Sequence, residues 1–339
     1  MADLSVNYLG LNLRSPLIVG SSGLTSGPAE MKKLEDNGAG AVVVKSLFEE
    51  QIRLEADHQA QGMRTDSMMS VGDLEIFDYL DYQVKEKYLT GYLERLHQAK
   101  KSLMIPVIAS INCVSSSEWV AFARQIEEAG ADALELNIAL MPAHTDITEQ
   151  QIVAIHQDII FKVKEHLSIP VAVKMSPSFA NMSWALRQIA QARPRGLVLF
   201  NRFYSPDINL DTLQVQPAPK FSSSSDLSQS LRWISLMSGK VGCDLCASTG
   251  VHTGEDVLKV LLAGGKAAQC VSALYQHGPQ HIQAMNAAME RWMEKKGYNY
   301  VDQFAGKLHE FEGNNPGVFE RIQFMKYYAQ IGDKTQPEA

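Results

Sequence analysis

The chain has 339 residues, of which 45% are hydrophobic and 20% charged, as is usual for a globular protein. The formal net charge of −7 argues against a nucleic-acid surface, because binding phosphates requires a basic footprint. No apolar run approaches the ~20 residues that span a bilayer, and the first residues lack the pattern of a secretory signal. Four cysteines do not make a disulfide framework. We therefore expect a cytoplasmic protein without a nucleic-acid or membrane partner.

Signals for strands and helices alternate along the chain. Residues 28–37, 116–129 and 148–166 carry helical spacing or capping signals, with Gly130 after the second helix and Thr148 opening the third. Short apolar runs predict eight strands, at residues 17–19, 41–44, 106–111, 131–136, 171–173, 197–200, 244–247 and 268–271. Alternating strands and helices predict a parallel sheet, and eight such units predict a (β/α)8 TIM barrel.

Two predicted connections are longer than barrel loops usually are. Residues 48–87 follow the second strand, and residues 201–226, which include four serines at 222–225, follow the sixth. Insertions at this end of a barrel shape substrate access or a subunit contact, and the serine run could form either a lid or a flexible linker. We expect a single domain over residues 1–339, with a core of about residues 9–308 and a C-terminal helical tail at 309–339.

Four of the predicted strands each end in one polar side chain. These side chains are Lys45, Asn137, Lys174 and Asn201. A single lysine after a strand more often begins a solvated loop, but four such strands in one chain favour a shared site. Because the C-terminal ends of parallel barrel strands converge on one mouth, the two lysines and two carboxamides should meet there. They suit an electron-rich planar ligand.

The loops after the seventh and eighth predicted strands carry a phosphate signature. Residues 247–254 contain Thr249, Gly250 and Val251 just before a predicted helix, and Ser272 follows the last strand. Glycine lets backbone N–H groups approach a phosphate at a helix N-terminus. Phosphate sites in TIM barrels are built from these two loops. The sequence therefore predicts a phosphate-bearing cofactor across the mouth.

Cys243 and Cys246 form a C-x-x-C pattern inside a predicted strand. A redox C-x-x-C normally opens a helix, and a zinc site would need a second pair of ligands. We interpret both cysteines as small core residues and expect no metal site. The cysteine spacing does not suit an iron–sulfur cluster either.

Sequence motifs occur in a fixed order along most of the chain. A-V-x-x-K-S, P-V-I-A-S-I, G-A-D-x-(L/I)-E-L-N and P-V-x-V-K-x-x-P occur at residues 41–46, 106–111, 130–137 and 170–177. Variants of N-P-(apolar)-A-S-G, G-T-G-G-I and Q-(apolar)-G-(T/S)-A-L occur at residues 15–23, 247–251 and 269–274. From about residue 9 to 308 the chain thus resembles the dihydroorotate dehydrogenase family, a group of FMN-dependent barrels that includes the flavin domain of dihydropyrimidine dehydrogenase.

The resemblance implies an FMN-dependent oxidoreductase that acts on the C–C bond of a dihydroorotate- or dihydropyrimidine-like substrate in pyrimidine metabolism. It implies that Lys174 lies near the flavin N1–O2 edge and opposes the charge of reduced flavin, and that Lys45 bonds the edge facing the substrate. It also implies a larger set of cofactor-binding residues, namely Ser21, Ser22, Gly23, Lys45, Ser46, Asn112, Asn137, Lys174, Asn201, Thr249, Gly250, Val251 and Ser272.

The chain departs from the family where the general base is expected. The family has Cys or Ser in the loop after its fourth strand, where this chain has Leu140, and leucine cannot accept a proton. Ala143 replaces the asparagine expected after the proline, and the N-x-M-G-(L/F)-x-N loop has only a distant counterpart at residues 66–72. His144 in the same loop and Cys113 after the third strand are alternative bases. Each could instead be a solvated histidine or a core-edge cysteine.

Three functions remain open from the sequence. Besides the dehydrogenase, the chain could be a flavoenzyme with a divergent substrate or a non-catalytic flavin- or phosphate-binding barrel subunit. Lys45 is a third catalytic candidate beside His144 and Cys113. Electrons would leave to a soluble acceptor or a partner protein, and a homodimer is expected.

Overall fold

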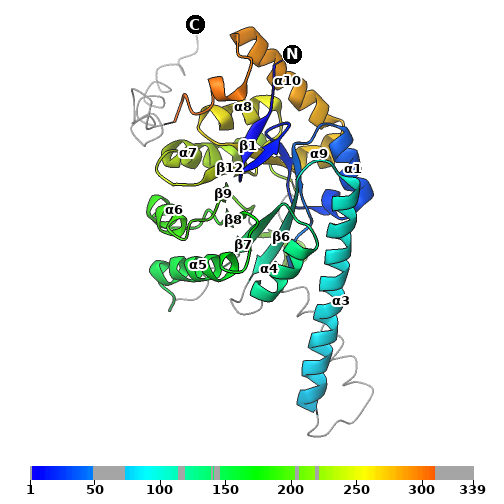
Figure 1. Ribbon diagram of the computed structural model, residues 1–339. Coiled ribbons are helices and arrows are strands. Elements are labelled where there is room, and N and C mark those ends of the chain that lie inside the picture. Colours follow the sequence, from blue (N-terminus) through cyan, green and yellow to red (C-terminus); the bar gives the residue numbers. More distant parts are fainter. Residues whose placement is uncertain are drawn as a thin grey trace.

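The computed structural model describes residues 2–48, 73–113, 119–138, 140, 146–202, 206–217 and 221–309 (Figure 1). Eight parallel strands form a closed barrel that is surrounded by helices, which confirms the predicted (β/α)8 TIM barrel. The strands are β3 (Leu17–Val19), β4 (Ala41–Val43), β6 (Val107–Cys113), β7 (Ala133–Ile138), β8 (Val171–Met175), β9 (Gly196–Leu199), β12 (Asp244–Ser248) and β13 (Ala267–Cys270).

Each barrel strand pairs in parallel with its neighbours, and the β4–β6 and β13–β3 pairings complete the ring. All residues of β3, β4, β7, β8, β9 and β13 are buried. Strands covered on both faces are read from sequence as continuous apolar runs, which is how all eight were found. The register places Asn112 beside Asn137 and Asn137 beside Lys174, so these three side chains lie at the same end of the barrel.

Helices cover the outside of the barrel (Figure 1). They are α1 (Pro28–Asp36), α3 (Asp73–Ser102), α4 (Trp119–Glu128), α5 (Glu149–Lys164), α6 (Met182–Ala190), α7 (Leu227–Met237), α8 (Gly254–Leu262), α9 (Ser272–His277) and α10 (His281–Lys296). The Thr148 hydroxyl accepts a hydrogen bond from the Gln151 backbone N–H, the capping predicted for the third helix. Short 3₁₀ turns occur at η1 (Gly23–Thr25), η2 (Ser224–Asp226) and η3 (Val301–Gln303).

The long connection after β4 contains more regular structure than the sequence predicted. A short strand, β5 (Leu47–Phe48), pairs with β6. The 30-residue helix α3 begins at Asp73, inside the stretch predicted to be loop, and extends well beyond the barrel (Figure 1). Residues 49–72, including the distant counterpart of the family loop at 66–72, lie outside the described residues.

An N-terminal hairpin closes the end of the barrel opposite the mouth. It consists of β1 (Val6–Tyr8) and β2 (Leu11–Leu13), and its Tyr8 is 1% exposed. The Leu9 backbone N–H donates to Asp244 Oδ2 at 2.8 Å, at the start of β12. A Cβ on Gly196, which begins β9, would lie 2.6 Å from Leu9 Cδ2, so this position has room only for glycine. The hairpin strands are three residues each and were not predicted.

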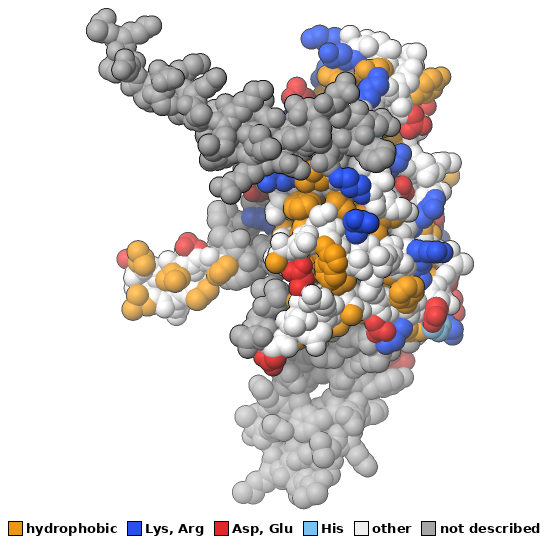
Figure 2. All heavy atoms as spheres, turned by 90° about the vertical axis from the view of Figure 1, so that its left-hand side faces the viewer, with side chains coloured by type: hydrophobic (Ala, Val, Ile, Leu, Met, Phe, Trp, Pro, Cys, Tyr) orange, Lys and Arg blue, Asp and Glu red, His pale blue; other side chains and the backbone are white. Residues whose placement is uncertain are grey.

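The long connection after β9 contains an antiparallel hairpin, β10 (Pro206–Asn209) and β11 (Gln214–Pro217). Figure 2 shows hydrophobic side chains on a small projecting lobe, consistent with the exposed hairpin residues Ile208, Leu210, Leu213 and Val215. The serine run that follows is not a simple linker, because Ser222 is buried and Ser224–Asp226 forms η2 before α7.

The chain after α10 continues to pack on the barrel as far as it is described. Phe304 is fully buried and makes an edge contact with Trp292, with ring centroids 5.0 Å apart. Phe311, Phe319 and Phe324, which belong to the predicted helical tail, lie outside the described residues. Among the described helices, none is both long enough and apolar enough to cross a membrane.

Candidate active site at the barrel mouth

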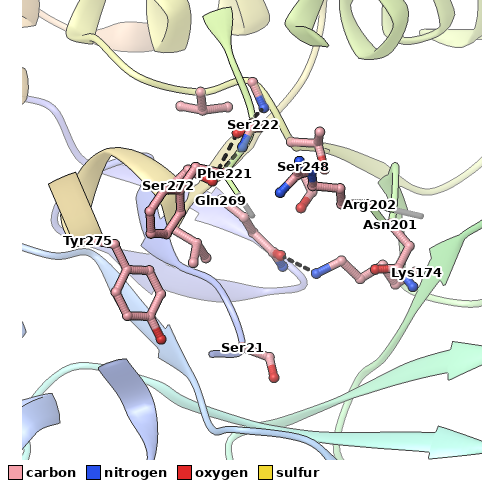
Figure 3. A pocket seen from close by; sticks show the side chains of 14 residues that line it. Ser21, Lys174, Asn201, Arg202, Phe221, Ser222, Ser248, Gln269, Ser272 and Tyr275 are labelled. Atoms are coloured by element: carbon pink, nitrogen blue, oxygen red, sulfur yellow. Dashed lines mark hydrogen bonds between the residues drawn. The ribbon is translucent and has the colours of Figure 1, made fainter. Parts of the chain in front are cut away.

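A cavity of ≈190 Å³ lies at the C-terminal ends of the barrel strands (Figure 3). Seven residues predicted to bind the cofactor line it: Ser21, Lys174, Asn201, Thr249, Gly250, Val251 and Ser272. They come from segments as far apart in sequence as the ends of β3 and β13. The barrel therefore brings the predicted phosphate loops and the predicted lysine of β8 to one cavity.

Lys174 lies at the floor of this cavity in a network that the sequence did not reveal. Its side chain is buried, and Nζ donates to Gln269 Oε1 at 2.9 Å and lies 3.4 Å from Glu135 Oε1 (Figure 3). Gln269 Nε2 in turn donates to Glu135 Oε2 at 2.5 Å. The signal that could have found Glu135 is its position inside an apolar strand, since a buried carboxylate requires a partner.

Two of the predicted asparagines contact each other, and one lacks a partner. Asn201 Nδ2 donates to Asn137 Oδ1 at 3.1 Å, which links the ends of β9 and β7. Asn112 is buried beside Asn137 in the sheet register, and its Oδ1 has no hydrogen-bond partner among the described residues. Because buried polar atoms are nearly always hydrogen-bonded, this acceptor is suited to a donor on a ligand.

Serine hydroxyls join the ends of β3, β4 and β6. Ser21 Oγ lies 2.8 Å from Ser46 Oγ, which lies 2.7 Å from Ser110 Oγ. The Tyr92 hydroxyl of α3 bonds both backbone groups of Ser110, at 2.7 and 3.0 Å, close to where β4 leaves the sheet. This network fixes Ser21 at the cavity wall.

Three other residues that were predicted to bind the cofactor do not line the cavity, namely Ser22, Gly23 and Lys45. The Ser22 hydroxyl caps η1 by accepting from the Leu24 backbone N–H at 3.3 Å. A Cβ on Gly23 would lie 2.6 Å from the Tyr275 hydroxyl, so this glycine allows a cavity-lining side chain to approach. Lys45 donates its backbone N–H to Thr25 O at 3.1 Å and exposes its side chain to solvent.

The predicted phosphate loops converge on Ser222, a residue that the sequence had placed only in a serine run. Ser222 Oγ accepts from the Gly250 backbone N–H at 3.3 Å and lies 3.0 Å from Ser272 Oγ and 3.2 Å from His252 Nε2 (Figure 3). The Ser222 backbone N–H also donates to Ser272 Oγ, at 3.0 Å. The Ser222 hydroxyl oxygen thus accepts a hydrogen bond from the Gly250 backbone N–H, as a phosphate oxygen bound at this loop would.

The residues considered as general bases lie mostly outside the described residues. His144 and Ala143 are not described, and Cys113 is described only through its backbone, which ends β6 beside Ile138. Leu140 is described, and its partly buried side chain packs against the hydrophobic core. At the position of the family's base the structure thus has an apolar contact.

The cysteines of the C-x-x-C pattern are free thiols. Burial, with the nearby Asp244 charge, raises the pKa of Cys243 to about 12, and burial raises the pKa of Cys246 further. Thiols held protonated in this way do not suit redox exchange, which agrees with their interpretation as core residues. Among the described residues, no group of three or more potential ligands could hold a metal ion.

Comparison with known proteins identifies the family. The family described as dihydroorotate dehydrogenase matches residues 3–293, nearly the whole chain. The chain belongs to the dihydroorotate dehydrogenase family. It is therefore an oxidoreductase of the dihydroorotate dehydrogenase type.

The chain is also similar to individual proteins over at least 90% of its length. The catalytic subunit of dihydroorotate dehydrogenase B (NAD(+)) from Thermoplasma acidophilum is 25% identical over 90% of this chain and 99% of its own length. A dihydroorotate dehydrogenase (fumarate) from Lachancea kluyveri is 24% identical over 91% and 99%. The chloroplastic dihydropyrimidine dehydrogenase (NADP(+)) of Arabidopsis thaliana is 22% identical over 94% of this chain and 80% of its own. The names of these three relatives give two kinds of ring substrate, dihydroorotate and dihydropyrimidine. They also give three redox partners, NAD(+), fumarate and NADP(+).

Proposed function

We propose that this protein binds FMN and catalyses oxidation or reduction of the C–C bond of a dihydroorotate- or dihydropyrimidine-like ring. The observation that carries the proposal is the buried Lys174 ammonium at the floor of a cavity whose other end holds the phosphate-loop donors. A buried cation at one end and anion-binding donors at the other match a planar cofactor with a phosphate tail.

The described residues fit FMN on three counts. Asn112 Oδ1 is a buried acceptor without a hydrogen-bond partner in the part of the chain that the structure describes. A Cβ on Gly20 would lie 3.0 Å from Val271 Cγ2 and 3.2 Å from Gln269 Oε1, so glycine keeps the backbone close to the cavity floor. Gly250, with φ of +80°, directs its backbone N–H at the Ser222 hydroxyl, where phosphate donors are expected. When bound, FMN would supply the hydride chemistry.

The protein's own residues would bind and orient the cofactor and the substrate, and would transfer the substrate proton. Lys174 opposes negative charge that develops at the cavity floor, which is stabilisation placed where the reaction needs it. Asn112, Asn137 and Asn201 hold the ring system through hydrogen bonds. Gly250 and Ser272, with Ser222, bind the phosphate. Ser21 and Ser46 line or support the wall, and the exposed Lys45 side chain would have to reach over the bound ring to bond the edge that faces the substrate.

The general base and the electron acceptor complete the proposal. His144, Cys113 and Lys45 are the candidates for moving the substrate proton, since Leu140 cannot. Electrons pass to a soluble acceptor or to a partner protein. We further propose a homodimer that works in the cytoplasm.

A divergent ring substrate is the second candidate function. The apolar contact of Leu140 at the position where the resemblance implies the base favours it, because leucine cannot accept the proton that dihydroorotate loses on oxidation. The named relatives are all dehydrogenases, so nothing among them favours a non-catalytic barrel.

The test begins with the purified protein. It should show flavin absorbance, and denaturation should release FMN rather than FAD. Anaerobic addition of dihydroorotate, dihydrouracil and dihydrothymine, each alone, then identifies the substrate as the compound that bleaches the flavin. A colourless protein that takes up no added FMN would contradict the proposal. A yellow protein that none of the three compounds bleaches would select the second candidate.

A further inference from the structure

The interior of the barrel contains a charged side chain where TIM barrels usually pack apolar ones. Glu135 points inward from β7 and is 1% exposed. Its two carboxylate oxygens face two partners, with Oε2 accepting from Gln269 Nε2 at 2.5 Å and Oε1 lying 3.4 Å from Lys174 Nζ. A carboxylate buried this deeply persists only when it is paired and hydrogen-bonded.

The groups around Glu135 leave Lys174 as its counter-charge. Tyr8 and Cys246 lie close enough to feel the carboxylate, and for both groups burial raises the pKa, with the charge of Glu135 adding to the effect. Both are therefore neutral at physiological pH. Among the described residues, the cation that contacts Glu135 is Lys174. The floor of the cavity thus holds one positive and one negative charge.

Gln269 fixes the geometry of this pair. Its Oε1 accepts from the Lys174 ammonium and its Nε2 donates to the Glu135 carboxylate, the orientation that both charges favour. The three side chains come from β7, β8 and β13 and form a closed ring of contacts. This ring restrains the flexible lysine, which otherwise has several rotamers to choose from.

We propose that Glu135 is a positioning residue for the reaction: it holds Lys174 at the cavity floor and attenuates the positive charge that Lys174 presents to the flavin. The inference rests on the proposed function in that the ligand is FMN. Without Glu135, no carboxylate would offset the attraction of the Lys174 ammonium for the negative charge of the reduced flavin. Without Lys174, the carboxylate would repel that negative charge. The two residues should therefore tune the flavin in opposite directions.

The experiment compares E135Q and K174M with the wild-type FMN protein by two readouts that are independent of turnover. These are the flavin midpoint potential and the dissociation constant of sulfite, which bleaches oxidised flavins more readily when positive charge is nearby. E135Q should raise the potential and tighten sulfite binding about tenfold, or ~1.4 kcal/mol. K174M should shift both the other way. Unchanged values in a folded E135Q protein would overturn the proposal.

Glu35 provides a matched control. It is also a buried carboxylate, 4% exposed, but it lies in α1 and accepts from the Met104 and Ile105 backbone N–H groups at 2.6 and 2.9 Å. E35Q should lower the melting temperature and leave sulfite affinity at the wild-type value. An equal change in E35Q would show that the E135Q effect is not local, which would overturn the proposal.

If E135Q does not fold, the double variant E135Q/K174M replaces it in the measurement of the flavin midpoint potential. The double variant leaves no unpaired charge buried at this pair. Its potential should be higher than that of K174M, since a negative charge has been removed. In flavin-free protein, melting of the two single variants and the double variant forms a double-mutant cycle. The double variant should lose less stability than the sum of the singles, and additive losses would refute the pairing. This arm needs no flavin, so a wild type that binds no FMN would count against the proposed function alone.

Discussion

Two halves of the barrel mouth differ in what their polar side chains contact. One half is formed by the ends of β8, β9, β12 and β13, and the other by the ends of β4, β6 and β7. In the first, the β12–β13 half, Lys174, Ser272 and Ser222 each have hydrogen-bond partners and line the cavity. In the second, the β6–β7 half, Asn112 Oδ1 meets no hydrogen-bond partner within the described segments, and Leu140 makes an apolar contact.

This difference separates cofactor binding from substrate chemistry. The named side chains of the β12–β13 half are hydrogen-bonded within the protein, which agrees with the proposed cofactor site. The β6–β7 half awaits a ligand at Asn112 and lacks the family's proton acceptor at Leu140. Under the proposed function, the first half would bind the cofactor and the second half would handle the substrate differently from the rest of the family. The following predictions test each half.

The largest expected effect concerns dihydroorotate and the β6–β7 half. General-base assistance is typically worth ~10²–10⁴-fold, so dihydroorotate oxidation should be slower than that of a family member with Cys or Ser by about this factor. L140S should raise the rate, because it restores a hydroxyl at the family's position. Steady-state rates of the wild type and L140S measure the effect.

The same assay distinguishes the alternative bases. H144A should abolish the residual wild-type rate if His144 is the base, and C113A should do so if Cys113 is. Turnover at a family-like rate that survives both substitutions would contradict our interpretation of this loop.

The next effect concerns the stability of the β12–β13 half. Gly250 has φ of +80°, and a Cβ there would lie 2.1 Å from the Leu227 backbone nitrogen. G250A should therefore lower the free energy of unfolding by about 3 kcal/mol or more and prevent FMN uptake. Chemical denaturation measures the change. G242A is the control, since nothing lies within 4 Å of a Cβ on Gly242, and it should be close to neutral. Equal losses in both variants would show that Gly250 is not special.

A substitution of Lys174 tests whether the β12–β13 half sets the flavin midpoint potential in addition to binding the flavin. K174M should lower the flavin midpoint potential, because it removes the positive charge that opposes the reduced form. FMN affinity should change less, since binding also draws on the phosphate loops. Spectroelectrochemical titration and fluorescence quenching measure the two quantities. A variant that loses affinity but keeps its potential would place Lys174 away from the redox-active part of the ring.

The fold could be predicted because its strands are continuous apolar runs that end in polar residues. Lys174 and Asn201 were found in this way, as the ends of parallel strands must converge. Elements without that signal were missed, such as the three-residue strands of the β1–β2 hairpin and the start of α3 at Asp73.

The contacts within the site could not be predicted, because they join distant residues. Glu135 and Gln269 are 134 positions apart, and Ser222 reaches Ser272 across 50. Only the barrel register brings them together. Lys45 also follows a barrel strand, but its side chain is exposed and does not line the described cavity, so its role at the site stays a prediction.

The smallest expected effect distinguishes the pH dependence of protein stability from the pH dependence of FMN binding at the mouth. His156 lies in α5, outside the mouth, and is 1% exposed. Its Nδ1 donates to Ile152 O at 2.8 Å, and Nε2 has no partner among the described residues. Burial lowers the pKa of His156 below its usual value, although the Ile152 carbonyl opposes the shift.

The unfolded chain therefore binds a proton at this residue more readily than the folded protein does. Stability should fall as the pH drops below about 6.5 through the lowered pKa, by ~1.4 kcal/mol for each unit of difference, and should be unaffected above it. H156Q should flatten this decline between pH 7.5 and 5.5 in thermal melts. If FMN affinity in H156Q still falls over that range, the pH dependence of FMN binding does not arise from His156. An unflattened melting profile would mean that another group controls the acid sensitivity of the fold.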